Sequence, residues 1–339
     1  MSNVLRMAGA VLIAFCAIQV LAAETRFAVY KSSDRGASWT QSDTGLPGNA
    51  RINAFAALDG AVLVGTDVGI FRSTNAAQSW SPAPGLSPAS GRILCFAVQG
   101  GRVIAGTDRG LQVSADAGVT WSPVSAFPAL QIRCLCVRGS ELLAGTDADG
   151  VLVSRNGGHH WSSQGPGLPA DAQVFALETV NGSLFAGLYS RGLYVWDPTR
   201  ASWRKTGSVT PLALAAANGT LVAGHNPGGI HWSSDGGVSW SRASGPIGNP
   251  LSVPELSDAA PVWQLAGGDG LAIAGAASGI FTSEDRGRTW VAAHSGIPVG
   301  SPGIAFAVSS AWVLAAVDQA GWVGPSQSSL GSSSGILDP

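Results

Sequence analysis

Apolar residues in this chain fall into short runs of four to six positions, separated by turns rich in glycine and aspartate. Residues 92–124 show the pattern clearly, with runs at 93–98, 102–107, 110–115 and 121–124. Runs of this length that are rich in β-branched and aromatic residues and end at Gly or Asp are typical of β-strands. The pattern therefore predicts units of four strands.

The first run of each unit alternates small side chains with larger ones, as in Cys95-Phe96-Ala97-Val98. Such a strand suits a narrow axis where neighbouring sheets crowd together, which is the centre of a β-propeller. The run recurs seven times and therefore predicts seven innermost strands. Its copies span residues 54–57, 95–98, 134–137, 176–179, 213–216, 264–267 and 305–308.

A second repeated pattern is an octet that ends in tryptophan, which at residues 114–121 reads Ser-Ala-Asp-Ala-Gly-Val-Thr-Trp. It returns at 32–39, 73–80, 154–161, 233–240 and 283–290, and in a degenerate form at 196–203. A period near forty residues indicates an array of one supersecondary unit. The closing tryptophans are Trp39, Trp80, Trp121, Trp161, Trp203, Trp240 and Trp290.

The octet is suited to a tight turn between two strands. The aspartate at its third position can accept hydrogen bonds from the backbone that follows, and the glycine at its fifth position adopts a positive φ without steric cost. The tryptophan opens the next strand with a large apolar surface that can anchor the turn to the core. The aspartates at this position are Asp34, Asp116, Asp235 and Asp285.

These octets resemble the Asp box, or BNR repeat, of sialidases, xyloglucan-cleaving glycosidases, sortilin-type receptors and photosystem II assembly factors. The resemblance spans residues 27–324, with Asn75 and Asn156 in place of the aspartate and Ala77 in place of the glycine. In those families the box is a structural turn on the face away from the ligand site. The resemblance therefore implies a fold rather than an activity.

The order of the repeats predicts how the ring closes. The first octet precedes all seven innermost runs, and no octet follows the last pair of runs. We therefore expect residues 27–41 to complete the final blade. The predicted fold is all-β, a single seven-bladed β-propeller of four-stranded blades in which N- and C-terminal strands share the last blade. Either residues 27–31 or residues 322–324 could supply its third strand.

The two ends of the chain differ in composition from the repeats. Residues 1–23 are typical of a signal peptide, with Arg6 before an apolar stretch and a cleavage point near Ala22 or Ala23. This predicts a secreted or periplasmic protein, with membrane contact only if the segment stays uncleaved as an anchor. Residues 24–325 form the predicted propeller, and residues 326–339 a Ser/Gly-rich tail that we expect to be disordered.

Charge and cysteine content exclude several classes of function. The formal net charge is −2 and the basic residues are scattered, which argues against a nucleic-acid partner. No spacing of ligands predicts a metal site or a cofactor, and we expect a monomer. After cleavage three cysteines remain, Cys95, Cys134 and Cys136, which stand where other repeats carry alanine. We interpret them as small apolar filler, with a Cys95–Cys134 bridge as the alternative.

Candidate binding residues lie where the repeat departs from itself. In propellers the loops between second and third strands share a face with the loops between blades. The aspartates that recur in the first set are expected to cap their own turns. Tyr189 and Arg191 replace that pattern in the fourth unit, and His225 and Asn226 in the fifth. With the insert at 243–261, the candidates for partner binding are Arg133, Glu178, Tyr189, Arg191, His225, Trp263 and Asp318.

The sequence predicts an exported, non-enzymatic binding or assembly scaffold for a protein or glycan partner. Its Gly-Thr-Asp-x-Gly loops and its Gly-Leu-Pro stretches at 45–47 and 167–169 resemble the photosystem II assembly factors. That resemblance implies a protein partner. The alternative is a glycoside hydrolase, sialidase-like or xyloglucanase-like, for which Asp147, Asp149 and Asp318 are eligible by loop position. No motif singles them out, so no catalytic residue is predicted.

Overall fold

The computed structural model describes residues 26–86, 90–125, 127–225, 229–245, 261–268, 270–298 and 300–319. Within these ranges the chain forms 28 strands. No helix long and apolar enough to cross a bilayer is found there. The predicted signal peptide, Asn226, most of the insert at 243–261 and the predicted tail lie outside the described residues.

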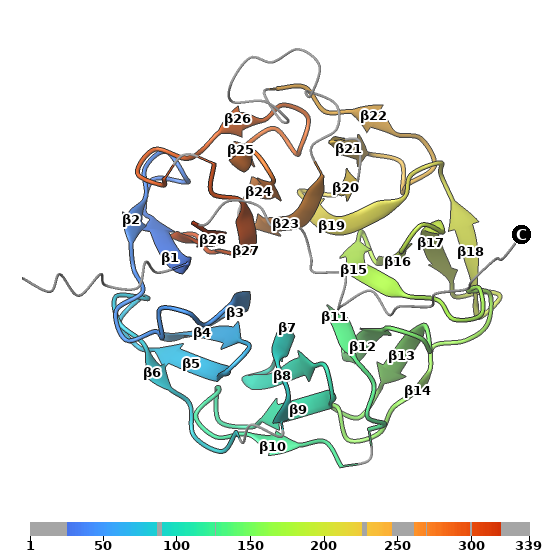
Figure 1. Ribbon diagram of the computed structural model, residues 1–339. Helices are drawn as coiled ribbons and strands as arrows, with labels where there is room; N and C mark the ends of the chain where they lie inside the picture. The colour runs from blue at the N-terminus through green and yellow to red at the C-terminus, as the bar shows by residue number, and fades with distance from the viewer. Residues whose placement is uncertain are drawn as a thin grey trace, which may run out of the picture.

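The strands form seven four-stranded antiparallel sheets arranged around a central axis (Figure 1). This confirms the predicted seven-bladed, all-β propeller. We number the blades 1 to 7 in the chain order of their innermost strands, which are β3 (Ile52–Leu58), β7 (Ile93–Gln99), β11 (Ile132–Arg138), β15 (Val174–Val180), β19 (Pro211–Ala217), β23 (Val262–Gly268) and β27 (Gly303–Val308). The second strands are β4 (Ala61–Thr66), β8 (Arg102–Thr107), β12 (Glu141–Thr146), β16 (Ser183–Leu188), β20 (Thr220–His225), β24 (Leu271–Ala276) and β28 (Val313–Asp318).

The outer half of each blade contains a third strand and a short edge strand. The third strands are β5 (Gly69–Ser73), β9 (Gly110–Ser114), β13 (Val151–Ser154), β17 (Gly192–Asp197), β21 (Ile230–Ser233), β25 (Gly279–Ser283) and β1 (Phe27–Ser32). The edge strands are β6 (Ser81–Pro82), β10 (Ser122–Pro123), β14 (Ser162–Ser163), β18 (Ser202–Thr206), β22 (Ser241–Arg242), β26 (Val291–Ala292) and β2 (Thr40–Gln41). Short edges offer little template for pairing with another chain.

Blade 7 is shared by the two ends of the ring. Strand β1 pairs antiparallel with β28 along its whole length, from Phe27 opposite Asp318 to Ser32 opposite Val313. Strand β2 forms the edge of the same sheet, which has the order β2-β1-β28-β27. The predicted closure is therefore confirmed, and β1 is the third strand of this blade.

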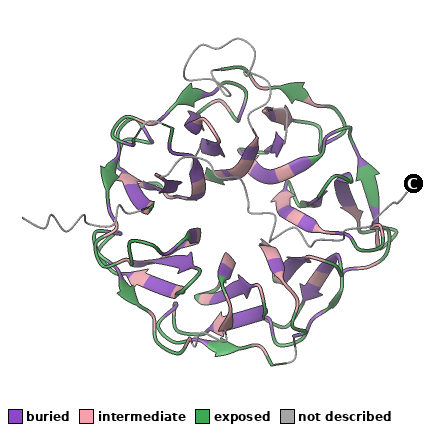
Figure 2. Ribbon diagram, in the orientation of Figure 1, coloured by how far each residue is buried: buried purple, intermediate pink, exposed green. Residues whose placement is uncertain are grey.

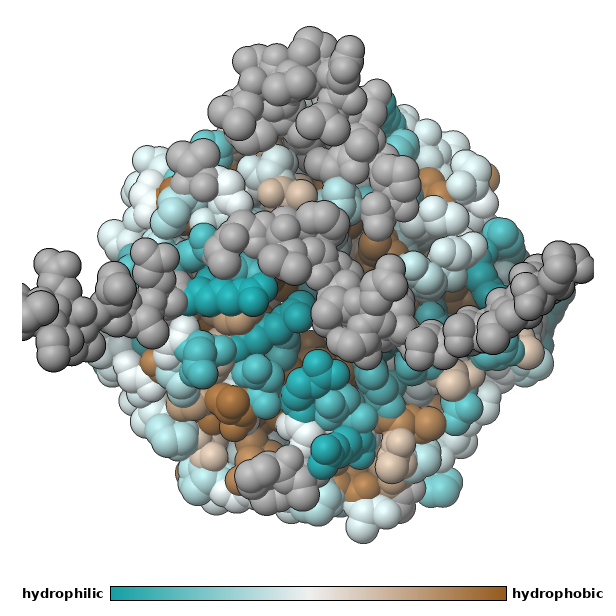
Figure 3. Space-filling view, in the orientation of Figure 1, coloured by the Kyte–Doolittle hydropathy of each residue, from teal (hydrophilic) through white to brown (hydrophobic). Residues whose placement is uncertain are grey.

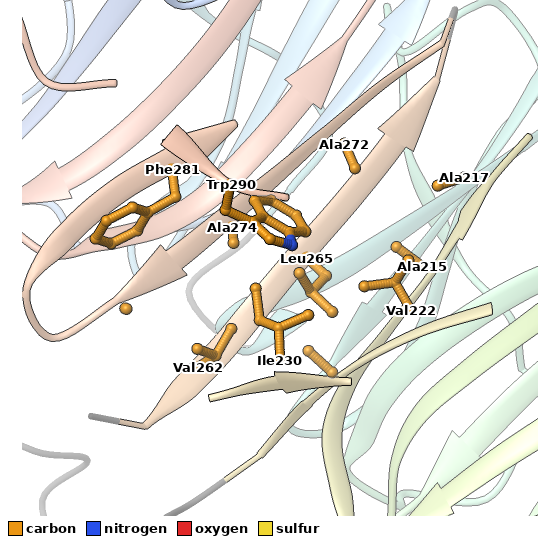
Figure 4. Close-up of a cluster of buried hydrophobic side chains, with 12 residues drawn as sticks. Ala215, Ala217, Val222, Ile230, Val262, Leu265, Ala272, Ala274, Phe281 and Trp290 are labelled. Carbon is orange, nitrogen blue, oxygen red and sulfur yellow. The ribbon is translucent and has the colours of Figure 1, made fainter. Parts of the chain in front are cut away.

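The apolar core lies between blades. One cluster joins Val222 and Ile230 of blade 5 to Leu265, Phe281 and Trp290 of blade 6 (Figure 4). The second strands are buried along nearly their whole length, whereas the two-residue edge strands are exposed (Figure 2). The longer edge strand β18 buries Trp203 and Thr206. Because each sheet buries both faces against its neighbours, the ring has seven such contacts and no separate central core.

Each Asp box turn is held by its own polar side chains. In the first box Ser32 donates to Asp34 at 2.7 Å, and the backbone N–H of Gly36 donates to Ser32 Oγ at 2.7 Å. The backbone N–H and the hydroxyl of Ser38 both donate to the Asp34 carboxylate. Hydrogen bonds from Ser38 and Ser32 lower the pKa of Asp34 to about 2. The Asp34 carboxylate therefore accepts its hydrogen bonds from its own turn, which indicates a structural role.

The variant boxes keep the same bonds with other atoms. Asn75 accepts from the Ser79 backbone at 3.0 Å and donates its amide to Ser79 Oγ at 2.8 Å. Ala77 adopts φ of 68°, which is the conformation that glycine supplies elsewhere. Six of the seven box tryptophans donate their indole N–H to a carbonyl, as Trp39 does to Ala293 of the preceding blade at 2.8 Å. The exception is Trp203 of the degenerate box, whose Nε1 has no partner among the described residues. The turn and its anchor thus survive substitution at the aspartate and at the glycine.

Candidate functional site

The loops between second and third strands meet the loops that enter each innermost strand, and we call this end of the channel the loop face. In blade 1 the Asp67 N–H donates to the Arg51 carbonyl at 3.1 Å, and the Arg51 N–H donates to the Asp67 carboxylate at 2.9 Å. Asp108 makes the same bonds with Arg92. These two aspartates tie one loop to the next, so they serve the scaffold.

All seven innermost strands carry a register irregularity at the same place, directly after their first paired residue. A bulge of this kind leaves one residue unpaired and redirects its side chain, and bulges are frequent beside functional sites. Here the extra residues form a ring around the axis at the loop face. The ring consists of Asn53, Leu94, Arg133, Phe175, Leu212, Trp263 and Ile304.

This ring, with the exception of Ile304, lines the upper part of a cavity of about 260 Å³ on the propeller axis. The deeper wall is formed by the small and apolar residues that follow on the same strands, such as Ala54, Cys95 and Leu177. We call the cavity with its ring the channel mouth. Its rim is chemically mixed, because one amide, one guanidinium and two aromatic rings stand among aliphatic side chains.

The most ordered part of the channel mouth is a stack between blades 3 and 4. Arg133 Nε lies 2.6 Å from Asp147 Oδ1, and the Arg133 guanidinium carbon lies 4.3 Å from the centre of the Phe175 ring. Phe175 in turn stacks on Tyr189, with ring centres 5.0 Å apart and planes inclined by 25°. The Arg133 side chain is only 13% exposed, whereas Tyr189 is 37% exposed. The stack therefore runs from a fixed cation out to solvent.

Blade 3 uses its loop aspartate differently from blades 1 and 2. Asp147 binds the side chain of the bulged residue Arg133, whereas Asp67 and Asp108 accept from the backbone N–H of the residue that enters the innermost strand. Asp108 binds the Arg92 side chain as well. A planar guanidinium held by one carboxylate and one ring face keeps its remaining N–H donors in a fixed direction. The arrangement can bind a carboxylate or a backbone carbonyl without first ordering a flexible side chain.

Further arginine–aspartate pairs stand around the channel mouth. Arg26 binds Asp318 at 3.1 Å, Arg92 binds Asp108 at 2.9 Å, and Arg191 lies 3.7 Å from Asp171. The three arginine side chains are 46–49% exposed, so each pair contributes little to stability. Figure 3 looks onto this face and shows hydrophilic groups gathered beside the axis, over β3 and β7. The side chains around the channel mouth therefore include both positive and negative charges.

The structure brings together only some of the predicted site residues. Arg133 and Trp263 line the cavity and Tyr189 flanks it, while Arg191 and Asp318 belong to the outer pairs. His225 is 5% exposed and faces His231 inside blade 5. Glu178 lies three residues beyond Phe175 on β15, and neither it nor His225 is among the cavity-lining residues described here. Trp263 has a further interaction within the molecule.

Glu178 is half-buried beside the wall between blades. Burial raises its pKa to about 7, against partial compensation by the backbone N–H groups of Thr179 and Ala216. The Thr179 N–H donates to Glu178 Oε1 at 2.8 Å. Blades 1, 2 and 5 carry Ala56, Ala97 and Ala215 at this position. Glu178 is therefore an interior carboxyl of a single blade, removed from the loop face.

Sequence reasoning missed Phe175, although it is central to the stack. The position just before the small-large run varies among amide, guanidinium, aromatic and aliphatic side chains, whereas the run itself is nearly uniform. That contrast would have identified the whole ring. Arg133 and Trp263 were recognised there, but an apolar Phe175 offered no chemical reason for attention until Arg133 was found on its face.

The three cysteines are free thiols, so the alternative of a Cys95–Cys134 bridge is not realised in this structure. Cys95 Sγ donates to the Ile132 carbonyl at 3.7 Å, and Cys134 Sγ to the Val174 carbonyl at 3.6 Å. Burial raises the pKa of Cys95 to about 12. These contacts agree with the interpretation as small filler that packs one blade on the next. Among the described residues no group of three or more His, Cys, Asp or Glu side chains is placed to bind a metal.

Comparisons with known proteins agree with the fold. Residues 280–292 match the family model of the BNR-Asp box repeat. The structure is similar to that of YCF48 bound to a D1 peptide, with a TM-score of 0.61, 17% identity, and coverage of 78% of this chain and 93% of that one. YCF48 from Cyanidioschyzon merolae gives a TM-score of 0.60 at 14% identity, with 82% and 98% covered. The chain is thus a β-propeller that carries a BNR-Asp box repeat at residues 280–292 and is similar in fold to YCF48.

A curated relative in sequence is a xyloglucanase from Paenibacillus sp., which is 30% identical over 171 residues. The match covers 45% of this chain and only 16% of the enzyme. An ancestral GH74 enzyme is similar in structure, with a TM-score of 0.52 and 17% identity over 75% of this chain and 37% of that one. Identities this low between structures show a shared fold alone.

Proposed function

We propose that this protein is a non-enzymatic binding module that receives an extended peptide segment of a protein partner at the channel mouth. The observation that carries the proposal is the stack of Arg133, Phe175 and Tyr189. Arginine and tyrosine dominate the binding energy of protein interfaces when they are central and surrounded by near-neutral contacts. Arg133 and Phe175 belong to the ring of bulged residues around the axis, and Tyr189 extends the stack to solvent.

Pre-ordering of the stack supports a peptide ligand. Asp147 and the Phe175 ring already fix the Arg133 guanidinium, so binding need not immobilise it. An extended peptide offers carbonyl oxygens at regular spacing and, with an acidic side chain, a carboxylate for bidentate bonding to arginine. Tyr189 adds an exposed aromatic face beside it. YCF48, which is similar in fold, has been seen with a D1 peptide bound.

The same geometry argues against the glycoside hydrolase alternative. Hydrolysis needs two carboxyl groups across a cleft, about 5–10 Å apart, one of them kept protonated as the acid. On the loop face Asp147 is bound to Arg133 and Asp318 to Arg26. Glu178, whose pKa is raised to about 7, lies away from the described cavity lining. A substrate at the channel mouth would meet arginine-bound carboxylates.

The site can be tested with repeat-matched substitutions. Arg133→Leu installs the residue of blade 2 at that position, and Tyr189→Asp installs the aspartate of blades 1 and 2. We would select peptides on the full chain from a random displayed library and measure affinities by calorimetry. We expect each substitution to weaken binding by about tenfold or more, since central arginine and tyrosine anchors contribute 2 kcal/mol or above.

The matched control is Val238→Thr, which changes an exposed side chain in an Asp box on the opposite face. It should leave peptide affinity unchanged. Equal binding by the parent and by both mouth variants would contradict the proposal. Release of reducing sugar from xyloglucan, lost on Asp147→Asn, would instead support the hydrolase, and retention on a glycan array without peptide binding would point to a glycan.

We further propose that the protein is exported, on the basis of Arg6 and the apolar stretch that follows it. Expression of residues 1–339 in a bacterium, followed by fractionation and N-terminal sequencing, tests this. We expect a mature chain that begins near residue 23 or 24 in the periplasm or the medium. A cytoplasmic chain that retains residues 1–23 would contradict it.

A further inference from the structure

Blade 5 contains two histidines in contact, His225 at the end of β20 and His231 in β21. Their ring centres are 4.8 Å apart and their planes are nearly perpendicular, at 88°. Both depart from the repeat. The position of His225 is occupied in blades 1 to 3 by Thr66, Thr107 and Thr146, whose hydroxyls close the neighbouring turn. The position of His231 is occupied by apolar or amide side chains, which are Phe71, Gln112, Leu152 and Phe281 in blades 1, 2, 3 and 6.

The hydrogen bonds of His225 leave one ring nitrogen with its lone pair available. The Thr210 backbone lies beside the ring, and Nε2 is buried with no hydrogen-bond partner within the described chain. In the tautomer that carries the proton on Nδ1, the Nε2 lone pair is available. A histidine that binds a metal commonly donates its other ring N–H to a backbone carbonyl in this way, which fixes the tautomer and the ring orientation.

His231 contributes a second such atom. Its Nδ1 is buried and has no hydrogen-bond partner in the part of the chain that the structure describes. A buried polar atom without a partner costs about 1–3 kcal/mol. Two such atoms on touching rings are difficult to explain as packing alone, because the repeat shows that threonine, phenylalanine or leucine fits the same positions. Something that accepts both lone pairs would remove the cost.

The ring separation fits a shared ion. Imidazole nitrogens bind Zn²⁺ and similar ions at about 2.0–2.1 Å, so two rings on one ion place their centres roughly 4.5–5.5 Å apart. The observed 4.8 Å lies in this range.

We propose that His225 Nε2 and His231 Nδ1 bind one divalent transition-metal ion of the class that prefers imidazole, Cu²⁺ or Zn²⁺. Cu²⁺ should bind more tightly, following the general order of affinities. Because the described residues offer no third His, Cys, Asp or Glu at the site, the ion would keep positions for water or an added ligand. The positive charge of Arg242, which also lowers the pKa of His231, opposes the ion. The site therefore suits exchangeable rather than permanent metal.

The test uses the full chain, dialysed free of metal and titrated with Cu²⁺ and, separately, Zn²⁺. We expect one ion per chain by calorimetry and mass spectrometry of metal content. The Cu²⁺ complex should show electron paramagnetic resonance hyperfine structure from two nitrogens. His225→Thr and His231→Phe install residues of other blades, and each should weaken binding by at least about tenfold. The control is His294→Gln, which removes a histidine outside the pair and should change nothing.

The proposal would be overturned if the parent took up no metal. It would also be overturned if the His225→Thr/His231→Phe double variant took up as much metal as the parent. Should the variants fold poorly, the unaltered protein still decides the question. Substoichiometric Cu²⁺ should broaden the NMR signals of two histidine rings before those of the other three. Equal broadening of all five histidines would mean adventitious surface binding. The result is independent of peptide binding at the channel mouth.

Discussion

The two ends of the propeller channel are built on opposite rules. On the Asp-box face the same turn recurs with the same bonds, so that Asp34, Asp116 and Asp235 each bind a hydroxyl and a backbone N–H of their own octet. On the loop face the bulged position carries amide, guanidinium, aromatic and aliphatic side chains, among them Arg133 and Trp263. Repetition marks the residues that hold the ring together, and departure from it marks those free to acquire other chemistry.

The Asp-box face should respond most strongly to loss of an anchor. Trp290 is 1% exposed, packs in the core cluster between blades 5 and 6, and donates its indole N–H to the Gly287 carbonyl at 3.0 Å. We expect Trp290→Ala to lower the free energy of unfolding by about 3–5 kcal/mol, because it leaves a large cavity. Urea unfolding followed by circular dichroism measures this. A loss below about 1 kcal/mol would show that the anchor is dispensable.

The interior carboxyl of Glu178 should have an intermediate effect that depends on pH. Its pKa is about 7 in the fold against an ordinary value of 4.5, so the native state holds the proton more tightly than the unfolded chain. Its contribution to stability is therefore complete below pH 4.5 and is lost as pH rises through 7. The loss is on the order of 3 kcal/mol.

Glu178→Ala, which matches blades 1, 2 and 5, should remove that component and make the protein more stable than the parent at pH 8. Urea midpoints for both proteins between pH 5 and pH 8.5 give the comparison. His225 has a depressed pKa of about 4. Its contribution to the free energy of unfolding is therefore lost as pH falls from about 6.5 to 4, and it is the same in parent and variant. Parallel stability curves for parent and variant would contradict the assignment to Glu178.

The smallest effect on stability should come from the channel mouth. Arg133 is bound to Asp147 beside the cavity on the axis, and blade 2 carries Leu94 at the same bulge. We expect Arg133→Leu to change the free energy of unfolding by less than about 1 kcal/mol, while peptide binding weakens by about tenfold or more. If this substitution unfolds the protein as Trp290→Ala does, the division between the two faces is wrong.

Most of the fold could be predicted because its determinants are local and repeated. The octet at residues 114–121 contains its own turn bonds and its own anchor, and six further copies fix the number of blades. The closure could be deduced from the unpaired octet at 32–39. The choice of β1 as third strand could not, because residues 322–324 are also apolar and only pairing in space distinguishes them.

The site was only partly accessible for the opposite reason. Arg133 and Tyr189 are 56 residues apart in the sequence. The phenyl group of Phe175 lies between them in space, and in the sequence Phe175 is indistinguishable from a core residue. Glu178 was expected near the loop face because it interrupts a run of alanines. Strand β15 runs away from the loop face, so Glu178 lies three residues deeper in the channel wall than Phe175. The repeat pattern in the sequence does not show how far along the axis a residue lies. His225 likewise turned out to face a partner inside its own blade.

The sharing of blade 7 has a consequence for how the molecule is made. Phe27 pairs with Asp318, so β1 has no partner strand until nearly three hundred later residues have been synthesised. Until then its backbone N–H and C=O groups are available for pairing with other chains. A circularly permuted chain that links residue 319 to residue 26 and opens between two other blades would make this sheet contiguous. Such a protein should refold faster and aggregate less on dilution from denaturant, since its slowest ring closure would become a local hairpin.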